Sequence, residues 1–284
     1  MSTVLRIYGI DFTSAPGPRK PIACAVAELT GSRLHLLALE RWTALADFEA
    51  FLGRAGPGLA GLDFPFGLPR AFVSTMGAPL DWQGYVERFS ALGRHGFRSA
   101  VAAFKAGQPA GHKDLKRETD RLARAASPLN ITRPPVGLMF FEGAGRLRRS
   151  GVSVWPCRPL ARAAMQVVEV YPALAARALI GRRPYKGGRG AKAAEQADVR
   201  RALLAALCGD TALRHYGLCL AAPNAERVEE LVGDGEGDGL DAVICALQAA
   251  WGYRRTGGQF GTPCAPGVSE GWIVDPALPL PDRT

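Results

Sequence analysis

The sequence predicts an α/β protein built around a mixed β-sheet, in which three antiparallel strands come first and parallel strands follow. Two observations lead to this fold class. Three apolar, β-compatible runs follow one another closely at the start of the chain, and the next such run is reached only through a stretch of helical periodicity. The length of 284 residues, with 48% hydrophobic and 21% charged residues, is that of a globular chain able to bury a sizeable core.

The first three strands are predicted at residues 4–10, 22–29 and 34–39. The first run is apolar, closes on Asp11 and is followed by a polar turn that contains Pro and Gly. Between the second and third runs lie four residues, Thr-Gly-Ser-Arg, whose length and composition suit a hairpin. The three runs are therefore expected to form an antiparallel meander.

A helix and a fourth strand come next. Apolar residues in the segment 43–54 recur at close to helical spacing, and a Gly-Pro-Gly sequence ends the helix. The fourth strand, at residues 59–64, also closes on an aspartate, Asp63. Because a helix precedes this strand, we expect it to run parallel to a neighbour in the sheet.

The middle of the chain is less regular. Residues 65–164 are interpreted as an insertion into the core fold between the fourth and fifth strands, with helical segments at 82–92 and 114–126. The fifth strand is predicted at residues 166–171. It leads into a helix over residues 172–180, which begins with a proline, a residue well suited to the first helical position.

The last part of the chain is predicted to be mainly helical. Helices are expected at residues 193–207 and 240–251, and Asp238 marks the start of the second. The tail, residues 257–284, is rich in Pro and Gly, with one short strand near residues 272–274. Without internal repeats or a clear linker, residues 1–284 are interpreted as a single domain.

Composition narrows the class of protein. The chain has 35 Lys and Arg against 26 Asp and Glu, a net charge of +9, which favours a polyanionic partner; the alternative is the basic composition typical of GC-rich genomes. Six dispersed cysteines without a CxxC pair indicate neither a zinc site nor a disulfide framework. Without a run of 18 apolar residues or a signal peptide, a cytoplasmic protein with no membrane contact is expected.

Four aspartates occupy the ends of predicted elements. Asp11 and Asp63 close two strands, while Asp238 and Asp241 share one face at the start of a helix. Four converging carboxylates repel one another unless cations neutralise them, and hard oxygen ligands favour Mg²⁺ or Mn²⁺. Two such ions are the usual device for in-line hydrolysis of phosphodiesters. Local roles are the alternative: a turn at Asp63, and helix capping by the Asp238 and Asp241 pair.

Four runs of sequence resemble the domain of unknown function 429 family, predicted RNase H-like nucleases: YGIDFT, GLDFPFGLP, EVYPA and DGLDAV, which begin at residues 8, 61, 169 and 238. The resemblance implies a ribonuclease H-like fold with a five-stranded mixed sheet flanked by helices. It also implies that Asp11, Asp63, Asp238 and Asp241 are the catalytic metal ligands. Glu169 belongs to the same motif set and is a further candidate ligand, although which face of the sheet it occupies stays open.

The last third of the chain is also similar to Holliday-junction resolvases. In that branch a strand followed by Tyr-x-Pro leads into a basic, Gly-containing loop, and a later helix opens with Asp-x-x-Asp-Ala. Here the loop contains Lys186. Resolvases usually have Glu where this chain has Asp63. The oligomeric state is left open, with a homodimer as one alternative.

Basic residues in three groups are candidates for substrate binding. The first group has helical spacing and acidic neighbours, so a solvated face is the alternative. The second has no acidic residue within it, and the third lies in a Gly-rich loop, which makes both better candidates for phosphate contacts. No base-reading motif is recognisable, so selection by nucleic-acid structure rather than by sequence is expected. The candidates are Lys113 and Arg117, Arg146 and Arg149, and Lys186 and Lys192.

The leading functional hypothesis is a metal-dependent nuclease acting on DNA or RNA. An ATPase or small-molecule kinase of the actin-like group is the first alternative, because Asp11 followed by Thr13 and Ser14 also resembles a phosphate-binding turn. That group normally has a second phosphate loop of Asp-x-Gly-Thr type, for which the segment after Asp63 is a poor match. The second alternative is a non-catalytic nucleic-acid-binding module on the same scaffold.

Overall fold

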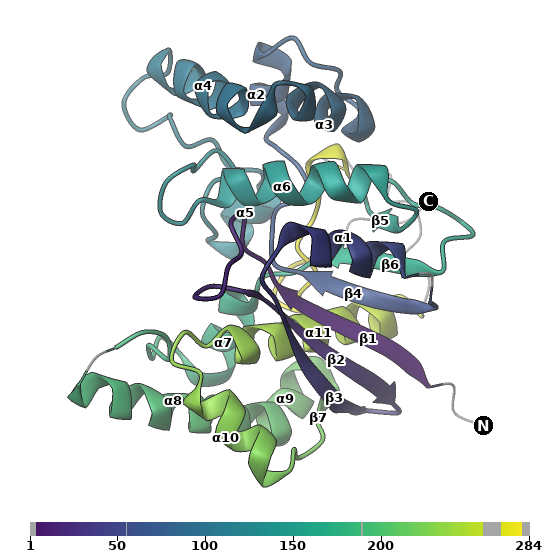
Figure 1. The fold of residues 1–284 in the computed structure, drawn as a ribbon, viewed down its shortest axis with the longest axis vertical. Helices are drawn as coiled ribbons and strands as arrows, with labels where there is room; N and C mark the ends of the chain where they lie inside the picture. Colours follow the sequence, from purple (N-terminus) through teal and green to yellow (C-terminus); the bar gives the residue numbers. More distant parts are fainter. Residues whose placement is uncertain (1–3, 55, 189, 258–267, 280–284) are drawn as a thin grey trace.

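The computed structural model describes residues 4–54, 56–188, 190–257 and 268–279, and its centre is one mixed β-sheet (Figure 1). The strand order is β5-β6-β4-β1-β2-β3-β7. The seven strands are β1 (Leu5–Asp11), β2 (Ile22–Thr30), β3 (Arg33–Trp42), β4 (Gly58–Leu62), β5 (Ser153–Trp155), β6 (Met165–Glu169) and β7 (Cys219–Leu220).

The predicted strand pattern is confirmed. Strands β1, β2 and β3 form the antiparallel meander, whose tight turn brings Thr30 opposite Arg33. Strand β4 runs parallel to β1 on the other side, and β6 runs parallel to β4. The expected number of five strands is wrong, because the sheet has seven. The two extra strands, β5 and β7, have three and two residues, too few for an alternating pattern to indicate a strand.

Eleven α-helices are described. Those expected near 43–54, 82–92, 172–180, 193–207 and 240–251 all form, whereas the one expected at 114–126 is confined to α5. A further helix, α10, covers the polar stretch after Asn224, whose side chain caps it by accepting from Arg227 N at 2.9 Å. The helices are α1 (Leu45–Gly53), α2 (Arg70–Thr75), α3 (Trp82–Ala91), α4 (Gly93–Ala106), α5 (Glu118–Ala123), α6 (Val136–Arg149), α7 (Pro172–Ile180), α8 (Ala191–Cys208), α9 (Asp210–Tyr216), α10 (Ala225–Gly233) and α11 (Asp238–Arg255).

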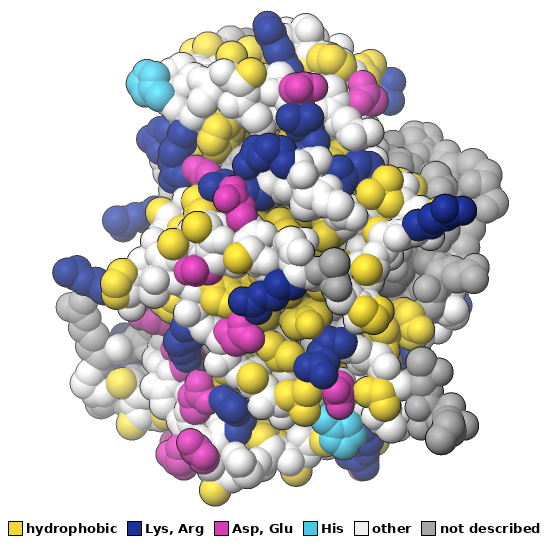
Figure 2. Space-filling view, turned by 45° about the vertical axis from the view of Figure 1, so that its right-hand side comes forward, with side chains coloured by type: hydrophobic (Ala, Val, Ile, Leu, Met, Phe, Trp, Pro, Cys, Tyr) yellow, Lys and Arg dark blue, Asp and Glu magenta, His cyan; other side chains and the backbone are white. Residues whose placement is uncertain are grey.

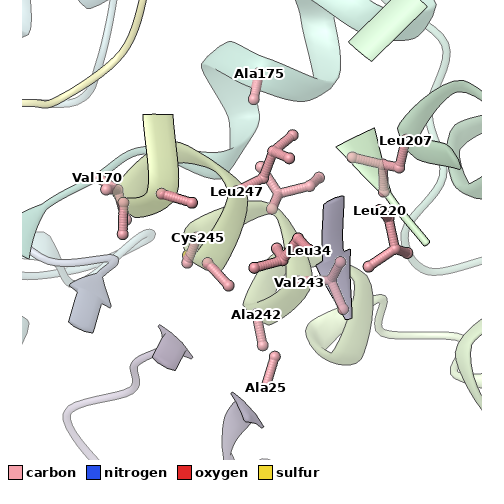
Figure 3. Close-up of a cluster of buried hydrophobic side chains, with 14 of the residues drawn as sticks. Ala25, Leu34, Val170, Ala175, Leu207, Leu220, Ala242, Val243, Cys245 and Leu247 are labelled. Atoms are coloured by element: carbon pink, nitrogen blue, oxygen red, sulfur yellow. The ribbon is translucent and has the colours of Figure 1, made fainter. Parts of the chain in front are cut away.

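Helices cover both faces of the sheet. Helix α11 crosses one face, with α7, α8 and α9 packed near it, and α1 and α6 lie on the other; α2, α3 and α4 form a group beyond α6 (Figure 1). Ala242 of α11 faces Ala25 of β2 within the buried cluster on the α11 face (Figure 3). The alternation of side chains along β1 places Ile7 on this face and Ile10 on the other.

Two glycines let α11 lie directly on the sheet. Gly9 of β1 is paired in register with Gly61 of β4. A Cβ atom at Gly9 would lie 2.0 Å from the carbonyl oxygen of Ala242, and one at Gly61 would lie 2.4 Å from that of Cys245. No other residue type fits at either position without moving α11. The helix therefore begins close to the ends of β1 and β4.

The C-terminal segment returns to the sheet edge. Instead of the short strand expected near residues 272–274, one parallel bridge joins Ile273 to Glu169. The remainder of the predicted tail, at 258–267 and 280–284, lies outside the described residues. In the part of the chain that the structure describes, none of the helices combines the length and the apolar character that crossing a membrane requires.

Candidate metal centre

Three of the four predicted aspartates meet at the end of the sheet. Asp11 is the last residue of β1, Asp63 follows β4 directly, and Asp241 lies in the first turn of α11. Each offers one carboxylate oxygen, and these three oxygens lie within 4.8 Å of one another. The alternation along β1 and β4 explains the meeting, because Asp11 and Asp63 each stand two residues after a glycine that faces α11.

Asp238 lies one helical turn before Asp241 and is buried, but it is not part of this three-carboxylate group. Its partner is Lys20, from the loop between β1 and β2, whose ammonium group forms an ion pair with Asp238 Oδ1. The negative charge of Asp238 still acts on the group, since it contributes to raising the pKa values of Asp11 and Asp241. The fourth aspartate therefore lies beside the centre, neutralised by a lysine.

Asp241 is held by two neighbours from the Gly-rich loop. The Tyr185 hydroxyl donates to Asp241 Oδ1 at 2.5 Å, and the Lys186 ammonium group pairs with Asp241 Oδ2. The loop is itself anchored by buried Arg200, which donates to the carbonyl oxygens of Tyr185 at 2.9 Å and Val232 at 2.6 Å. Lys186 was predicted to contact substrate; in the structure it contacts a predicted metal ligand.

Sequence reasoning missed Lys20, Tyr185 and Arg200. The neighbours of Lys20 in sequence indicate only a basic loop. Tyr185 stands between a proline and a lysine, and no motif at that position indicates a functional tyrosine. Arg200 lies on α8 in a helix with a weakly amphipathic pattern, so its burial was not apparent. The signal that points to Tyr185 is its position directly before Lys186, in the loop that resembles the basic loop of resolvases.

The three carboxylates resist ionisation together. Loss of hydration raises the pKa of Asp11 well above its usual range, and the nearby charge of Asp241 raises it further. The same two causes raise the pKa of Asp63 to about 8, against the opposing effect of Lys186. Burial also raises the pKa of Asp241, although Lys186 and Tyr185 act in the other direction.

Lys186 differs from the three carboxylates, because its surroundings favour its charged form. Burial by itself would lower the pKa of its ammonium group, but the carboxylates of Asp241 and Asp11 outweigh burial and raise it. The lysine therefore stays charged beside the carboxylates.

The donor set fits a hard divalent cation. If all four aspartates are ionised, they carry four negative charges, and Lys20 and Lys186 supply two positive ones. Two negative charges remain, which one divalent cation would neutralise. Carboxylate oxygens are the ligands that Mg²⁺ and Mn²⁺ prefer. A bound cation would also relieve the mutual repulsion that raises the carboxylate pKa values. Asp11, Asp63 and Asp241 can therefore hold one such ion.

Glu169 lies on the other face of the sheet from α11, although its charge contributes to raising the pKa of Asp63. Along β6, Val168 packs on the α11 face while Val167 packs on the other, and the alternation puts Glu169 with Val167. Its carboxylate accepts from Arg117 at 2.6 and 2.9 Å and from the backbone N–H of Phe66 at 2.9 Å. Glu169 is therefore engaged in a buried ion pair on the opposite side of the sheet.

Arg117 is not on a solvated face. Its side chain is 2% exposed, and it pairs with Asp120 as well as with Glu169. It also donates to the carbonyl oxygen of Glu270 at 2.8 Å. All five N–H groups of its guanidinium are therefore used within the protein, which leaves none for a phosphate. This network joins α5, β6 and the C-terminal segment.

A cavity of about 150 Å³ is lined both by residues of this network and by Asp63 of the centre. Asp63 lies on one side of it, and Arg117 and Glu169 line another part. Met139 and Tyr171 contribute apolar and aromatic surface. Asp63 of the centre therefore borders the same cavity as Arg117 and Glu169.

The other predicted substrate-binding residues lie elsewhere. Arg146 pairs with Glu49 at 3.0 Å and with Glu142 at 2.7 Å, and Arg149 lies 3.4 Å from Glu49. On the face shown in Figure 2, acidic side chains accompany many of the basic ones. Lys113 and Lys192 are exposed, and neither belongs to the group around Asp241. Arg146 and Arg149 are therefore paired with glutamates, Glu142 of the same helix and Glu49 of α1.

Comparison with known proteins identifies the family. Residues 9–262 match the model of the family described as protein of unknown function (DUF429). A search of curated proteins and a search of solved structures each found no match. The match begins at Gly9 within β1 and covers the two strand-ending aspartates and the whole of α11, so it includes Asp11, Asp63 and Asp241 of the candidate centre.

Proposed function

The chain belongs to the DUF429 family, and for this member we propose divalent-metal-dependent hydrolysis of phosphodiester bonds in nucleic acid, on a ribonuclease H-like fold. The observation that carries the proposal is the convergence of Asp11, Asp63 and Asp241 from three separate elements to within 4.8 Å. The strand order supports it, because the five expected strands lie in the antiparallel-then-parallel arrangement that the family resemblance implies.

Asp11, Asp63 and Asp241 would hold Mg²⁺ or Mn²⁺. When bound, such an ion supplies Lewis-acid polarisation of a phosphoryl oxygen and neutralises charge that develops during in-line displacement. Tyr185 keeps Asp241 oriented through its hydroxyl hydrogen bond. A second ion, as the four-aspartate prediction requires, would draw on Asp238, which must then exchange its partner Lys20 for the ion.

Lys186 has a separate role in this proposal. Its ammonium group now neutralises Asp241. With a divalent ion bound, Lys186 would bind a non-bridging phosphate oxygen of the substrate from its place beside Asp241. It thereby orients the phosphodiester beside the carboxylates and stabilises added negative charge as the bond breaks.

The test is a cleavage assay with purified protein, Mg²⁺ or Mn²⁺, and a panel of single-stranded and duplex DNA, RNA, hybrids and four-way junctions. Asp11→Asn should lower cleavage by about 100-fold or more, because loss of supporting groups around a metal already costs 10- to 100-fold. The matched control is Asp198→Asn, which changes an exposed aspartate that pairs with Arg201. Undiminished cleavage by Asp11→Asn would refute the assignment.

Two results would favour the alternatives. Saturable binding of ATP in calorimetry, without cleavage of any nucleic acid, would indicate the phosphotransfer class that the Asp11 turn also resembles. Nucleic-acid binding without cleavage, together with a melting temperature that Mg²⁺ and Mn²⁺ leave unchanged, would indicate a non-catalytic module.

A further inference from the structure

A groove lined by arginines opens beside the candidate metal centre. Its volume is about 600 Å³, and it lies between the end of α5 and the segment that follows α7. Four arginines line it, together with small residues and Tyr185, and none of the lining residues is acidic. The arginines are Arg124, Arg177, Arg182 and Arg183.

The charges of this groove are not neutralised within the described part of the chain. None of the four arginines forms an ion pair there, in contrast to Arg146 and Arg149. Arg177 donates only to the carbonyl oxygen of Ala123, at 2.8 Å, and Arg183 to that of Ile180, at 3.0 Å. The guanidinium groups therefore keep their charge and most of their donors for another molecule.

The backbone at Arg124 gives a second, independent indication. Arg124 ends α5 in the left-handed conformation, with φ of 53°, and it is the only non-glycine residue with positive φ among those described. Glycine normally occupies such a position, because any other residue pays for it in steric strain. An arginine kept in this conformation projects from the end of α5 at the edge of the groove. Strain of this kind points to a use for the side chain.

Tyr185 connects the groove to the carboxylates. Tyr185 is one of the residues that line the groove, and its hydroxyl donates to Asp241. Arg177 lies over the ring of Tyr171, which lines the cavity next to Asp63. The groove and the three aspartates thus share Tyr185 as a common neighbour.

We propose that this groove binds the sugar-phosphate backbone of a nucleic-acid strand on its way to the carboxylates, with the phosphates held by Arg124, Arg182 and Arg183. The inference deepens the proposed function and rests on it for the direction of the strand. A concave, arginine-lined surface suits a linear polyanion, because planar guanidinium groups pair with phosphate oxygens in a two-pronged geometry. An anionic membrane, being flat, would not reach into it.

The test measures binding of a fluorescent 20-nucleotide single strand in EDTA, so that no cleavage occurs. The groove variant is Arg124→Gly/Arg182→Ala/Arg183→Ala. We expect it to raise Kd about tenfold or more at low salt, and to reduce the slope of log Kd against log salt by about 2, since each phosphate contact on a single strand contributes about 0.7.

The matched control removes three charges from other places. It is Arg54→Ala/Arg149→Ala/Arg201→Ala, three exposed arginines that each pair with a carboxylate. Equal weakening by the two triple variants would overturn the proposal, because net charge alone would then explain binding. So would a groove variant that weakens binding to phosphatidylserine vesicles but leaves oligonucleotide binding unchanged.

Two further measurements distinguish loss of binding in the groove from loss of folding and from loss of catalysis. Arg124→Gly alone relieves the backbone strain, so its melting temperature should not fall, whereas its affinity for the oligonucleotide should. Hydrolysis of bis(p-nitrophenyl) phosphate with Mn²⁺ should survive in the groove variant, because this small diester does not span the groove, and should be lost in Asp11→Asn. If the wild-type protein hydrolyses no diester, the proposed nuclease function fails, while the binding comparison still decides the groove.

Discussion

Asp63 has a pKa of about 8 because its carboxylate loses hydration on folding and faces the charge of Asp241. Between about pH 4 and pH 8 the folded protein therefore holds a proton on Asp63 that the unfolded chain has released. Folding is favoured by proton binding in this range, so its free energy becomes less favourable as the pH rises. A bound divalent cation would offset this penalty, because it would stabilise the ionised carboxylates.

This leads to a pH prediction. In EDTA, the melting temperature should fall as the pH rises from 5 to 8, and Asp63→Asn should make that dependence shallower. The increase in melting temperature caused by Mn²⁺ should grow with pH over the same range and vanish in the variant. Differential scanning fluorimetry at fixed ionic strength measures both effects, with Asp114→Asn, an exposed aspartate, as the control. A stabilisation by Mn²⁺ that is independent of pH would contradict the prediction.

At the scale of elements, the centre depends on how closely α11 approaches β1 and β4. Gly9 and Gly61 are paired across the two strands, and each precedes an aspartate of the centre by two residues. The same strand residues therefore set both the distance from helix to sheet and the direction of the carboxylates. A side chain at either glycine would push the helix that carries Asp241 away from the strands.

Gly9→Ala should accordingly destabilise the protein by about 1–3 kcal/mol through overpacking, and it should also weaken Mn²⁺ binding. Urea unfolding measures the first effect, and titration calorimetry the second. The control is Gly53→Ala at the end of α1, where an added Cβ meets no atom within 4 Å. If Gly9→Ala lowers stability but leaves Mn²⁺ affinity at the wild-type value, the link between helix placement and the centre is wrong.

At the scale of the whole molecule, the C-terminal segment fastens the residues between β4 and β6 to the sheet. Ile273 forms a bridge with Glu169, and its backbone N–H donates to the Thr119 hydroxyl at 3.0 Å. The carbonyl oxygen of Ser269 accepts from Tyr85 of α3, and that of Glu270 from Arg117. Segments far apart in sequence thus meet beside the cavity that adjoins Asp63.

Ile273→Asp tests this role of the C-terminal segment. Ile273 is 2% exposed, so a charge placed there loses its hydration without a partner, and the free energy of unfolding should fall by about 3 kcal/mol. Leu160→Asp is the control, since Leu160 is 41% exposed and should tolerate the charge. Urea denaturation compares the two. Equal stability of both variants would show that the segment does not fasten the fold.

Much of this architecture follows from local patterns. The alternation and turns of the first 64 residues predict the meander, the helix and the parallel strand, because each depends on neighbours a few residues away. Asp11 and Asp63 could be placed at one sheet edge by the same reasoning. Strands β5 and β7 could not be predicted, because two or three residues carry no period, and they form only where an existing edge accepts them.

Ion pairs between residues far apart in sequence could not be predicted from the sequence. Lys20 meets Asp238 across 218 positions, and Arg117 meets Glu169 across 52. Arg146 pairs with Glu142 one turn earlier on its own helix, but its second partner, Glu49, lies on α1. Such pairings depend on the packing of distant segments, so short-range spacing gives no information about them.

By itself, the sequence determined the α/β class, the mixed sheet and the aspartates at its strand ends, because these depend on periodicity and turn chemistry within short windows. Tertiary structure alone decided that Asp11, Asp63 and Asp241 form the centre, that Asp238 is held by Lys20, and that Glu169 turns to the opposite face. The physical reason is that a cluster of carboxylates from separate elements forms only where those elements lie within a few ångströms of one another. Those distances are set by how α11 packs on Gly9 and Gly61, which no local pattern reports.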